Sequence, residues 1–102
     1  MAEVRWTPQA ADDLAAICEF IARDSSEMAG IFADRVLRAT DRLAQFPRAG
    51  RIVPELGVQN IRELIVGSYR VIYRVRKDNA VQLLTVHHGA RPLDPSQLES
   101  IH

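Results

Sequence analysis

Residue types that support common kinds of chemistry are scarce or badly placed in this 102-residue sequence. The single cysteine, Cys18, excludes an internal disulfide, and its place in a helical apolar pattern favours a buried small hydrophobic residue over a reactive thiol. His87 and His88 are adjacent, so on a strand they point to opposite faces and cannot bind one metal ion together. The sequence has no glycine-rich phosphate-binding motif and no Gly-x-Ser-x-Gly element. We therefore expect no metal, no cofactor and no acyl-transfer chemistry.

Long apolar runs are missing as well. No stretch approaches the roughly 20 apolar residues that cross a bilayer, and the N-terminus lacks the basic segment and apolar run of a signal peptide. We therefore expect a cytoplasmic protein that does not bind a membrane. With 47% apolar and 25% charged residues, the chain can build one hydrophobic core, so residues 1–102 are predicted to form a single domain.

Lysine is almost absent, because twelve of the thirteen basic residues are arginine. The formal net charge is zero, but residues 1–46 contain five arginines and eight acidic residues, whereas residues 47–102 contain eight basic and five acidic residues. Guanidinium groups make bidentate contacts with phosphate and carboxylate, so the second half is expected to bind an acidic or polyanionic partner. A codon preference for arginine explains the composition equally well.

The order of the expected elements indicates an α+β fold. Residues 3–6 form a short β-prone run, after which Thr7 can cap a helix and Pro8 can occupy its first position. Apolar residues then recur at spacings of three and four, which predicts an amphipathic helix. A second helix follows residues 24–26, and its apolar stripe ends at Phe46. The short connection makes the two helices antiparallel.

Strands are expected after an irregular segment at residues 48–60. Three runs rich in β-branched and aromatic residues lie at residues 61–66, 69–76 and 80–88. The two short gaps between them contain turn-forming residues, so the runs are predicted to form a three-stranded antiparallel meander. The helical hairpin is expected to pack on one face of this sheet.

The register of the meander follows if both turns contain two residues, because directly opposed residues point to the same face. The apolar face toward the helices then contains Tyr69 opposite His88, Val71 opposite Val86, Tyr73 opposite Leu84, and also Leu64 and Val66. The other face is basic and contains Arg70, Ile72, Arg74, Arg76, Leu83, Thr85 and His87, with Glu63 next to Ile72. Arginines expected near its edges are Arg51, Arg62 and Arg91. A solvated strand would look the same, but three arginines on one strand repel each other without a partner.

Metal-free RNA cleavage is compatible with the residues of this basic face, since it needs a base, an acid and a cation beside the phosphate. The candidates are Glu55 or Glu63 as the base, His87 or His88 as the acid, and Arg51, Arg62 or Arg70 as the cation. Any basic sheet with a histidine meets these requirements, and a strand histidine is more often a structural residue.

Six short segments occur in a characteristic order: residues 6–10 (WTPQA), 46–51 (FPRAGR), 53–55 (VPE), 62–64 (REL), 69–73 (YRVIY) and 88–91 (HGAR). Together with the expected elements, they resemble the RelE/ParE toxin superfamily over nearly the whole chain. This resemblance implies the toxin of a bacterial type II toxin–antitoxin pair. It also implies a cognate antitoxin whose extended or helical C-terminal segment wraps around the toxin and neutralises it.

The superfamily combines two activities, ribosome-dependent mRNA cleavage in the RelE-like branch and inhibition of DNA gyrase in the ParE-like branch. Nuclease relatives usually have a tyrosine soon after the last strand and several basic residues around the cleft, whereas this chain has no tyrosine beyond Tyr73 and one lysine, Lys77. Arg70 matches the recurrent strand arginine of the superfamily, but Leu64 stands where nuclease relatives tend to have another arginine. The resemblance therefore favours the ParE-like branch.

The first hypothesis is thus a plasmid-stabilisation toxin that binds DNA gyrase, blocks replication and has no catalytic activity. Its predicted target-binding residues are Arg51, Arg62, Arg70, Arg74, Arg76, His87 and Arg91. The alternative is an mRNA endonuclease that acts with the ribosome, with catalytic residues Arg51, Glu63, Arg70, His87 and His88. A third hypothesis is a non-toxic stabilisation module whose basic face binds an acidic partner. A homodimer and a toxin–antitoxin hetero-oligomer both stay open, as does the retention of toxicity.

Overall fold

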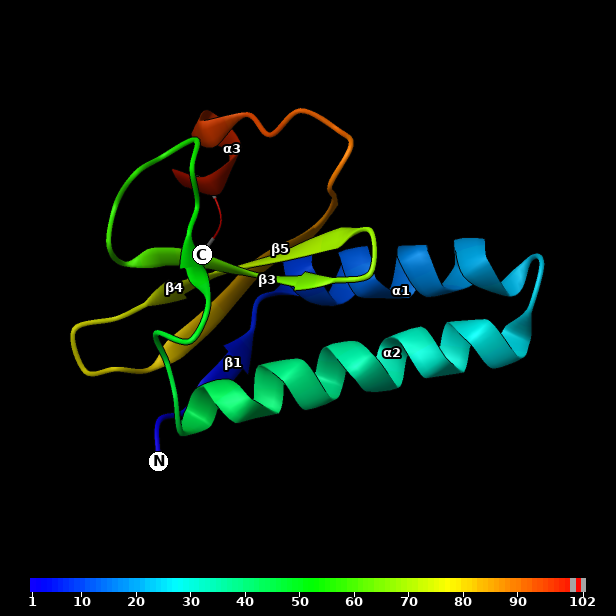
Figure 1. Ribbon diagram of the computed structural model, residues 1–102, viewed down its shortest axis with the longest axis horizontal. Helices are drawn as coiled ribbons and strands as arrows, with labels where there is room; N and C mark the ends of the chain where they lie inside the picture. Colours follow the sequence, from blue (N-terminus) through cyan, green and yellow to red (C-terminus); the bar gives the residue numbers. More distant parts are fainter. Residues whose placement is uncertain (100, 102) are drawn as a thin grey trace.

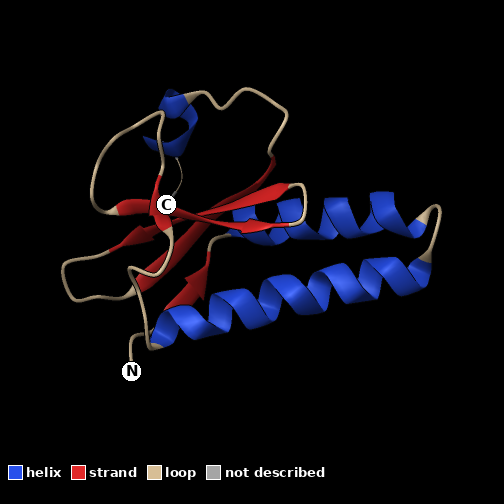
Figure 2. Ribbon diagram, viewed as in Figure 1, coloured by secondary structure: helices blue, strands red, loops and turns tan. Residues whose placement is uncertain are grey.

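A computed structural model describes residues 1–99 and 101 and contains one five-stranded sheet (Figures 1 and 2). Its elements are β1 (Val4–Trp6), α1 (Pro8–Ala22), α2 (Ser26–Asp41), the 3-10 turn η1 (Arg42–Ala44), β2 (Arg51–Ile52), β3 (Ile61–Val66), β4 (Tyr69–Val75), β5 (Val81–His88) and α3 (Pro95–Glu99). The strand order is β1-β5-β4-β3-β2, in which β1 is parallel to β5 and the other neighbours are antiparallel. The predicted α+β fold is confirmed, and β2, η1 and α3 are additions to it.

Both long helices begin where the sequence predicts. The hydroxyls of Thr7 and Ser25 each accept the backbone N–H three residues further along the chain. Each cap satisfies a donor that has no partner within the helix and contributes about 0.5–2 kcal/mol. The second helix ends earlier than predicted, because η1 tightens the chain after Asp41 and leaves Phe46 exposed. No helix in residues 1–99 is long and apolar enough to cross a membrane.

The helical hairpin of α1 and α2 packs on one face of the sheet, as predicted (Figure 1). Apolar side chains from both layers form the larger core, which contains Ala10, Phe32, Val36, Leu43, Val66, Val71, Tyr73, Val75, Val81, Leu83 and Val86. Burial stabilises such a core by about 25 cal/mol for each Å² of apolar surface removed from water. The meander is therefore anchored to the hairpin along its whole length.

A β-bulge in β5 changes the predicted register. The first two predicted pairs of β4 and β5 are confirmed, but the third is wrong. Ile72 lies opposite Thr85 and Tyr73 lies opposite Leu83, so Leu84 is an extra residue that has no partner in β4. As a result Leu83 packs toward the helices and Leu84 packs on the other face, which is the reverse of the prediction.

The face opposite the helical hairpin is less basic than predicted, because a second apolar cluster covers its centre. That cluster contains Val53, Ile61, Ile72, Leu84, Leu93 and Leu98. Residues 53–60 and α3 lie on this side of the sheet, away from α2 (Figure 1). Ile72 and Leu84 have no exposed surface, so the middle of this face is core and only its margins carry charge.

The edge of β5 is completed by side chains from the start of α1. The parallel partner β1 covers only residues 81–83. Beyond it, the hydroxyl of Thr7 donates to the carbonyl oxygen of Leu83 at 2.7 Å, and the carboxylate of Asp13 accepts the N–H of Val86 at 3.1 Å. These bonds replace part of the missing strand, since buried backbone groups need partners.

Candidate functional site

Two of the predicted arginines belong to an ion-pair network on the face of the sheet away from the helical hairpin. Arg70 donates through Nε to Glu63 at 2.6 Å, and its Nη1 and Nη2 donate to the two oxygens of Glu55 at 2.6 and 2.7 Å. Arg51 donates through Nε to the second oxygen of Glu63 at 2.5 Å. Two guanidinium groups therefore alternate with two carboxylates.

The sheet and one loop bring these four residues together. Glu63 in β3 lies opposite Ile72, as predicted, so it shares a face with Arg70 two residues earlier in β4. Arg51 lies opposite Glu63 in the short strand β2. Glu55 comes from residues 53–60, which cover this face. The network thus joins two strands and the covering loop to β4.

The network is largely withdrawn from water. The side chain of Glu63 has no exposed surface, that of Arg70 is 10% exposed and that of Glu55 is 32% exposed. An isolated carboxylate would cost several kcal/mol to bury, and the two guanidinium groups offset that cost. The hydrogen bonds from Arg70 lower the pKa of Glu55 to about 2, and the bonds to Glu55 in turn raise the pKa of Arg70. Glu55 and Arg70 therefore stay charged near neutral pH.

The two histidines have separate surroundings. His87 is half-buried, lies opposite Arg70 in the sheet, and places Nε2 2.9 Å from the carbonyl oxygen of Arg91. A carbonyl oxygen only accepts, so Nε2 of His87 carries the proton. His88 is exposed, and its ring meets Tyr69 edge-on at a centroid distance of 5.1 Å. The structure therefore brings His87 close to the network and directs His88 to the other side of the sheet.

The remaining predicted arginines lie outside the network. Arg62 shares the face of Tyr73, toward the helices, and donates to the carbonyl oxygens of Arg48 and Gly50, so it supports a loop instead of the predicted basic face. Arg91 is exposed at the end of the segment that follows β5. Other predicted contacts on the margin of the basic face are Arg74, which is half-buried, and Arg76, which is exposed.

Sequence reasoning missed two contacts that hold the site. It named Glu55 only as a possible base, whereas the structure makes it the bidentate partner of Arg70. It also placed Tyr73 only in the apolar face, whereas the hydroxyl of Tyr73 accepts the N–H of Gly50 at 2.9 Å, and burial raises the pKa of Tyr73. Both contacts involve a residue from the short segments that carry the family resemblance: Gly50 lies in residues 46–51 and Glu55 in residues 53–55. These two segments were the sequence signal that could have pointed to the contacts.

The geometry limits what the site can do chemically. A general base needs a free lone pair and a pKa near the working pH. The side chain of Glu63 has no exposed surface and cannot reach a substrate hydroxyl, and the pKa of Glu55 is about 2, so both are poor bases at neutral pH. Three of the five donors of Arg70 are used on these carboxylates. Within residues 1–99 and 101, no group of three or more His, Cys, Asp or Glu could hold a metal ion.

Comparison with known proteins identifies the family. The profile of the family described as "ParE toxin of type II toxin-antitoxin system, parDE" matches residues 4–93. Toxin RelE2 of Caulobacter vibrioides is 37% identical over 91 residues, which cover 89% of this chain and 99% of the relative. Putative toxin Y4kP of Sinorhizobium fredii is 33% identical over 88 residues, which cover 84% of this chain and 86% of the relative.

Two solved structures share the fold. The chromosomal ParDE system from P. aeruginosa has a TM-score of 0.70 and 24% identity, covering 86% of this chain and 96% of that chain. The RelBE2 toxin–antitoxin complex from Mycobacterium tuberculosis has a TM-score of 0.56 and 22% identity, covering 85% and 96%. The match over residues 4–93 and the sequence relatives show that this chain belongs to the ParE toxin family of type II toxin–antitoxin systems, within the ParE/RelE superfamily.

Proposed function

We propose that this toxin inhibits growth by binding DNA gyrase and blocking replication, that it has no catalytic activity, and that a cognate antitoxin neutralises it. The observation that supports binding over catalysis is the ion-pair network of Arg70. In this network the superfamily's recurrent strand arginine is held by Glu55 and Glu63.

Cleavage of RNA would need these same groups in a free state. A phosphate that develops negative charge requires a cation whose donors point at it, but the donors of Arg70 point at Glu55 and Glu63. A base is missing from the network for the reasons given above. His87 alone would have to supply the proton transfer, without a second acid or base and without a guanidinium group whose donors are free for the phosphate. Binding is therefore the simpler use of this surface.

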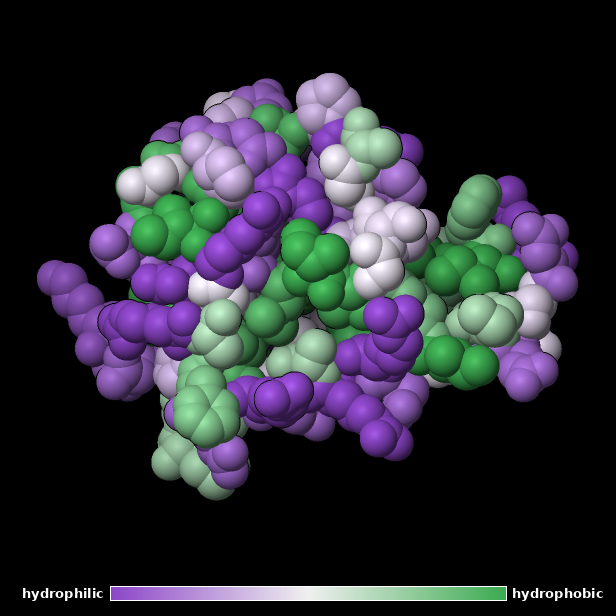
Figure 3. Space-filling model, in the orientation of Figure 1, coloured by the Kyte–Doolittle hydropathy of each residue, from purple (hydrophilic) through white to green (hydrophobic). Residues whose placement is uncertain are grey.

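Exposed apolar side chains support a protein partner. Phe20 at the end of α1 and Met28 and Ile31 at the start of α2 are 62%, 53% and 44% exposed. Hydrophobic residues gather at this end of the hairpin in the space-filling view (Figure 3). Such patches on small proteins often mark interfaces. Both solved structures that share the fold come from toxin–antitoxin systems, ParDE and RelBE2, which supports an antitoxin for this chain.

We assign fewer residues to target contacts than the sequence predicts. Arg51 and Arg70 are held by carboxylates and Arg62 by carbonyl oxygens, so these three serve the toxin's own structure. Arg74 on β4 and Arg76 just after it, with His87 near the end of β5 and Arg91 in the segment that follows, remain as candidate contacts. Because gyrase acts on DNA in the bacterial cytoplasm, we also place the toxin there.

The test compares two reactions with one protein preparation. The purified toxin is added to DNA gyrase, ATP and relaxed plasmid, and in parallel to ribosomes programmed with mRNA. We expect supercoiling to stop, added antitoxin to restore it, and the mRNA to stay intact. Continued supercoiling together with codon-specific cuts in the mRNA would refute the proposal and support the nuclease alternative. If neither reaction responds although the toxin is folded, the proposal is also wrong.

A further inference from the structure

A cluster of basic residues lies at the turn between β4 and β5, apart from the Arg70 network. We call Arg48, Arg74, Arg76 and Lys77 the cationic tip. They line an open depression of about 650 Å³, together with Asn60 and Asp78. Hydrophilic residues gather at this end of the molecule in the space-filling view (Figure 3).

The positive charges of the cationic tip are not compensated. Arg48 donates to the amide oxygen of Asn79 at 3.0 Å and Arg74 donates to the amide oxygen of Gln82 at 3.2 Å, and both acceptors are neutral. Within the described residues, none of the four basic side chains forms an ion pair. Arg70 differs from these four residues, because three of its donors are bound to two carboxylates.

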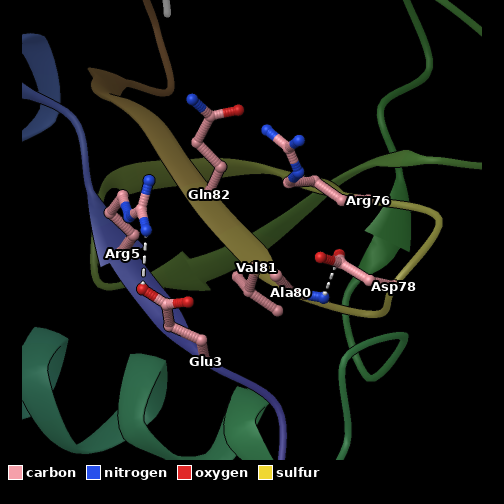
Figure 4. A pocket seen from close by; sticks show the side chains of 7 residues that line it. All are labelled: Glu3, Arg5, Arg76, Asp78, Ala80, Val81 and Gln82. Atoms are coloured by element: carbon pink, nitrogen blue, oxygen red, sulfur yellow. Dashed lines mark hydrogen bonds and ion pairs between the residues drawn. The ribbon is translucent and has the colours of Figure 1, made fainter.

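The single acidic residue at the depression does not neutralise it. One oxygen of Asp78 accepts the N–H of Ala80 at 3.0 Å within the turn. In the neighbouring pocket, which Arg76 also lines, the side chain of Arg76 extends toward Gln82 and away from Asp78 (Figure 4). Three of the four charges are therefore in excess, in a solvent-open position where an anionic ligand can reach them.

The fold holds the cationic tip in place before any ligand arrives. Asn79 adopts a φ of 66°, the left-handed conformation that closes a three-residue hairpin turn. Arg62 donates to the carbonyl oxygens of Arg48 and Gly50, which fixes the loop that carries Arg48 beside this turn. Binding then has to order fewer side chains and less of the loop, which lowers its entropic cost.

The chemistry of the depression identifies the class of ligand. Protein interfaces depend on buried aromatic or apolar anchors, and the apolar residue in this depression, Val75, is only 2% exposed. Phosphate backbones are bound instead by arginine, lysine and neutral polar groups, and such interfaces are polar and positively charged. We propose that the cationic tip binds the phosphate backbone of a nucleic acid.

This inference goes beyond the proposed function and does not depend on it, because it assigns Arg74 and Arg76 to the nucleic acid instead of to gyrase itself. Gyrase holds DNA and the ribosome holds RNA, so a toxin directed at either target meets a phosphate backbone. The shared chemistry is the phosphodiester chain, and the two sources are separated by experiment.

Fluorescence anisotropy of the purified toxin tests the inference, with a labelled DNA duplex and a single-stranded RNA of the same sequence at a series of salt concentrations. We expect binding to at least one of them, with a log K against log salt slope of about −3.6 for four cations on the duplex. The variant R74Q/R76Q/K77Q should bind at least about tenfold more weakly at low salt and reduce that slope to about −1.

A matched control removes the same number of charges elsewhere. The variant R23Q/R35Q/R42Q changes three exposed arginines of the helical layer, one after α1, one in α2 and one in η1, and we expect its affinity to stay within about twofold of the wild type. Circular dichroism confirms that both variants are folded. Equal losses in the two variants, or no binding of the wild type to DNA or RNA at low salt, would overturn the inference.

The alternative partner of the cationic tip is an acidic protein surface. Binding of the toxin to gyrase in the absence of DNA tests this alternative. If R74Q/R76Q/K77Q loses gyrase binding there while the wild type binds neither nucleic acid, the cationic tip contacts protein and the inference is wrong. A toxin that fails to bind gyrase but shows the expected salt dependence would refute the proposed target and support the cationic tip as a phosphate site.

Discussion

Arg70 and Glu63 are opposite charges on the sheet face away from the helical hairpin, and the removal of Arg70 alone takes one guanidinium partner from Glu63 and both guanidinium hydrogen bonds from Glu55. We expect Arg70→Gln to lower the free energy of unfolding by about 3–5 kcal/mol, because Glu63 would lose a guanidinium partner while its side chain stays buried. Urea denaturation measures this change. Arg76→Gln, just after the same strand and exposed, is the control and should stay within about 0.5 kcal/mol of the wild type. Equal stability of the two variants would show that the network contributes nothing.

Alanine substitutions at Gly50 and Gly30 are a second matched pair of variants. A Cβ added at Gly50 would lie 2.5 Å from the carbonyl oxygen of Glu63 and 2.7 Å from the hydroxyl of Tyr73. We expect Gly50→Ala to cost about 1–3 kcal/mol, because one of these groups must shift. A Cβ at Gly30 meets nothing within 4 Å, so Gly30→Ala should stabilise α2 by about 0.5–1 kcal/mol. Thermal denaturation followed by circular dichroism compares them, and a destabilised Gly30→Ala or a neutral Gly50→Ala would contradict the packing described here.

Sequence reasoning located individual residues where a regular period held. Alternation along the strands placed Glu63 beside Ile72 and put Arg70 on the same face, and both placements are confirmed. It failed at Leu83 and Leu84, because an extra residue in a strand leaves no mark in an apolar run. It also could not pair Glu55 with Arg70, since the loop that carries Glu55 has no period from which a direction could be read.

Residues 53–60 are tied to the sheet by Glu55, and this link gives the covering loop a pH dependence. The pKa of Glu55 is lowered from 4.5 to about 2 in the folded protein. A group whose folded pKa is depressed stabilises the fold fully above its unfolded pKa and loses that contribution as the pH falls toward the folded value. The link should therefore be intact above about pH 5 and weaken between about pH 4.5 and 2.

The prediction is that the wild type loses stability more steeply than Glu55→Gln over this acidic range. Chemical denaturation at several pH values measures both, and the two proteins should show parallel curves above about pH 5. Because the side chain of Glu55 is 32% exposed, solvent screening makes the difference modest. Identical pH dependence of the two proteins would show that the bond between Glu55 and Arg70 does not hold the loop.

The length of a helix or strand decides whether its position can be predicted from the sequence. The helices α1 and α2 and the strands β3, β4 and β5 are long enough to show a period, and their predicted positions agree closely with the structure. The strand β2 has two residues and α3 has five, which is too short for a pattern to emerge. Yet β2 positions Arg51 and α3 helps to cover the second core, so both affect the site.

For the whole molecule, the contrast between an acidic half and an arginine-rich half has a structural explanation. Some of the excess arginines form contacts within the fold, since Arg51 and Arg70 pair with two carboxylates and Arg62 supports a loop. What remains for partners is concentrated at the cationic tip. Net charge along the sequence therefore indicated the half of the chain that contains the cationic tip, but it could not separate arginines that build the fold from those that face solvent.

The most direct test of the account replaces the network by a neutral pair and asks whether the protein is still toxic. In R70M/E63Q the two buried charges are removed together, so no unpaired charge remains buried. Glu55 and Arg51 lose their partners, but their side chains are 32% and 61% exposed and can be hydrated, so the fold should persist. Growth of bacteria is followed after induction of this variant and of the wild type, with folding of the purified variant checked by circular dichroism. Growth arrest by the folded variant, comparable to the wild type, is the predicted result, because the network supports the fold and takes no part in toxicity. A folded variant that no longer arrests growth would contradict the account.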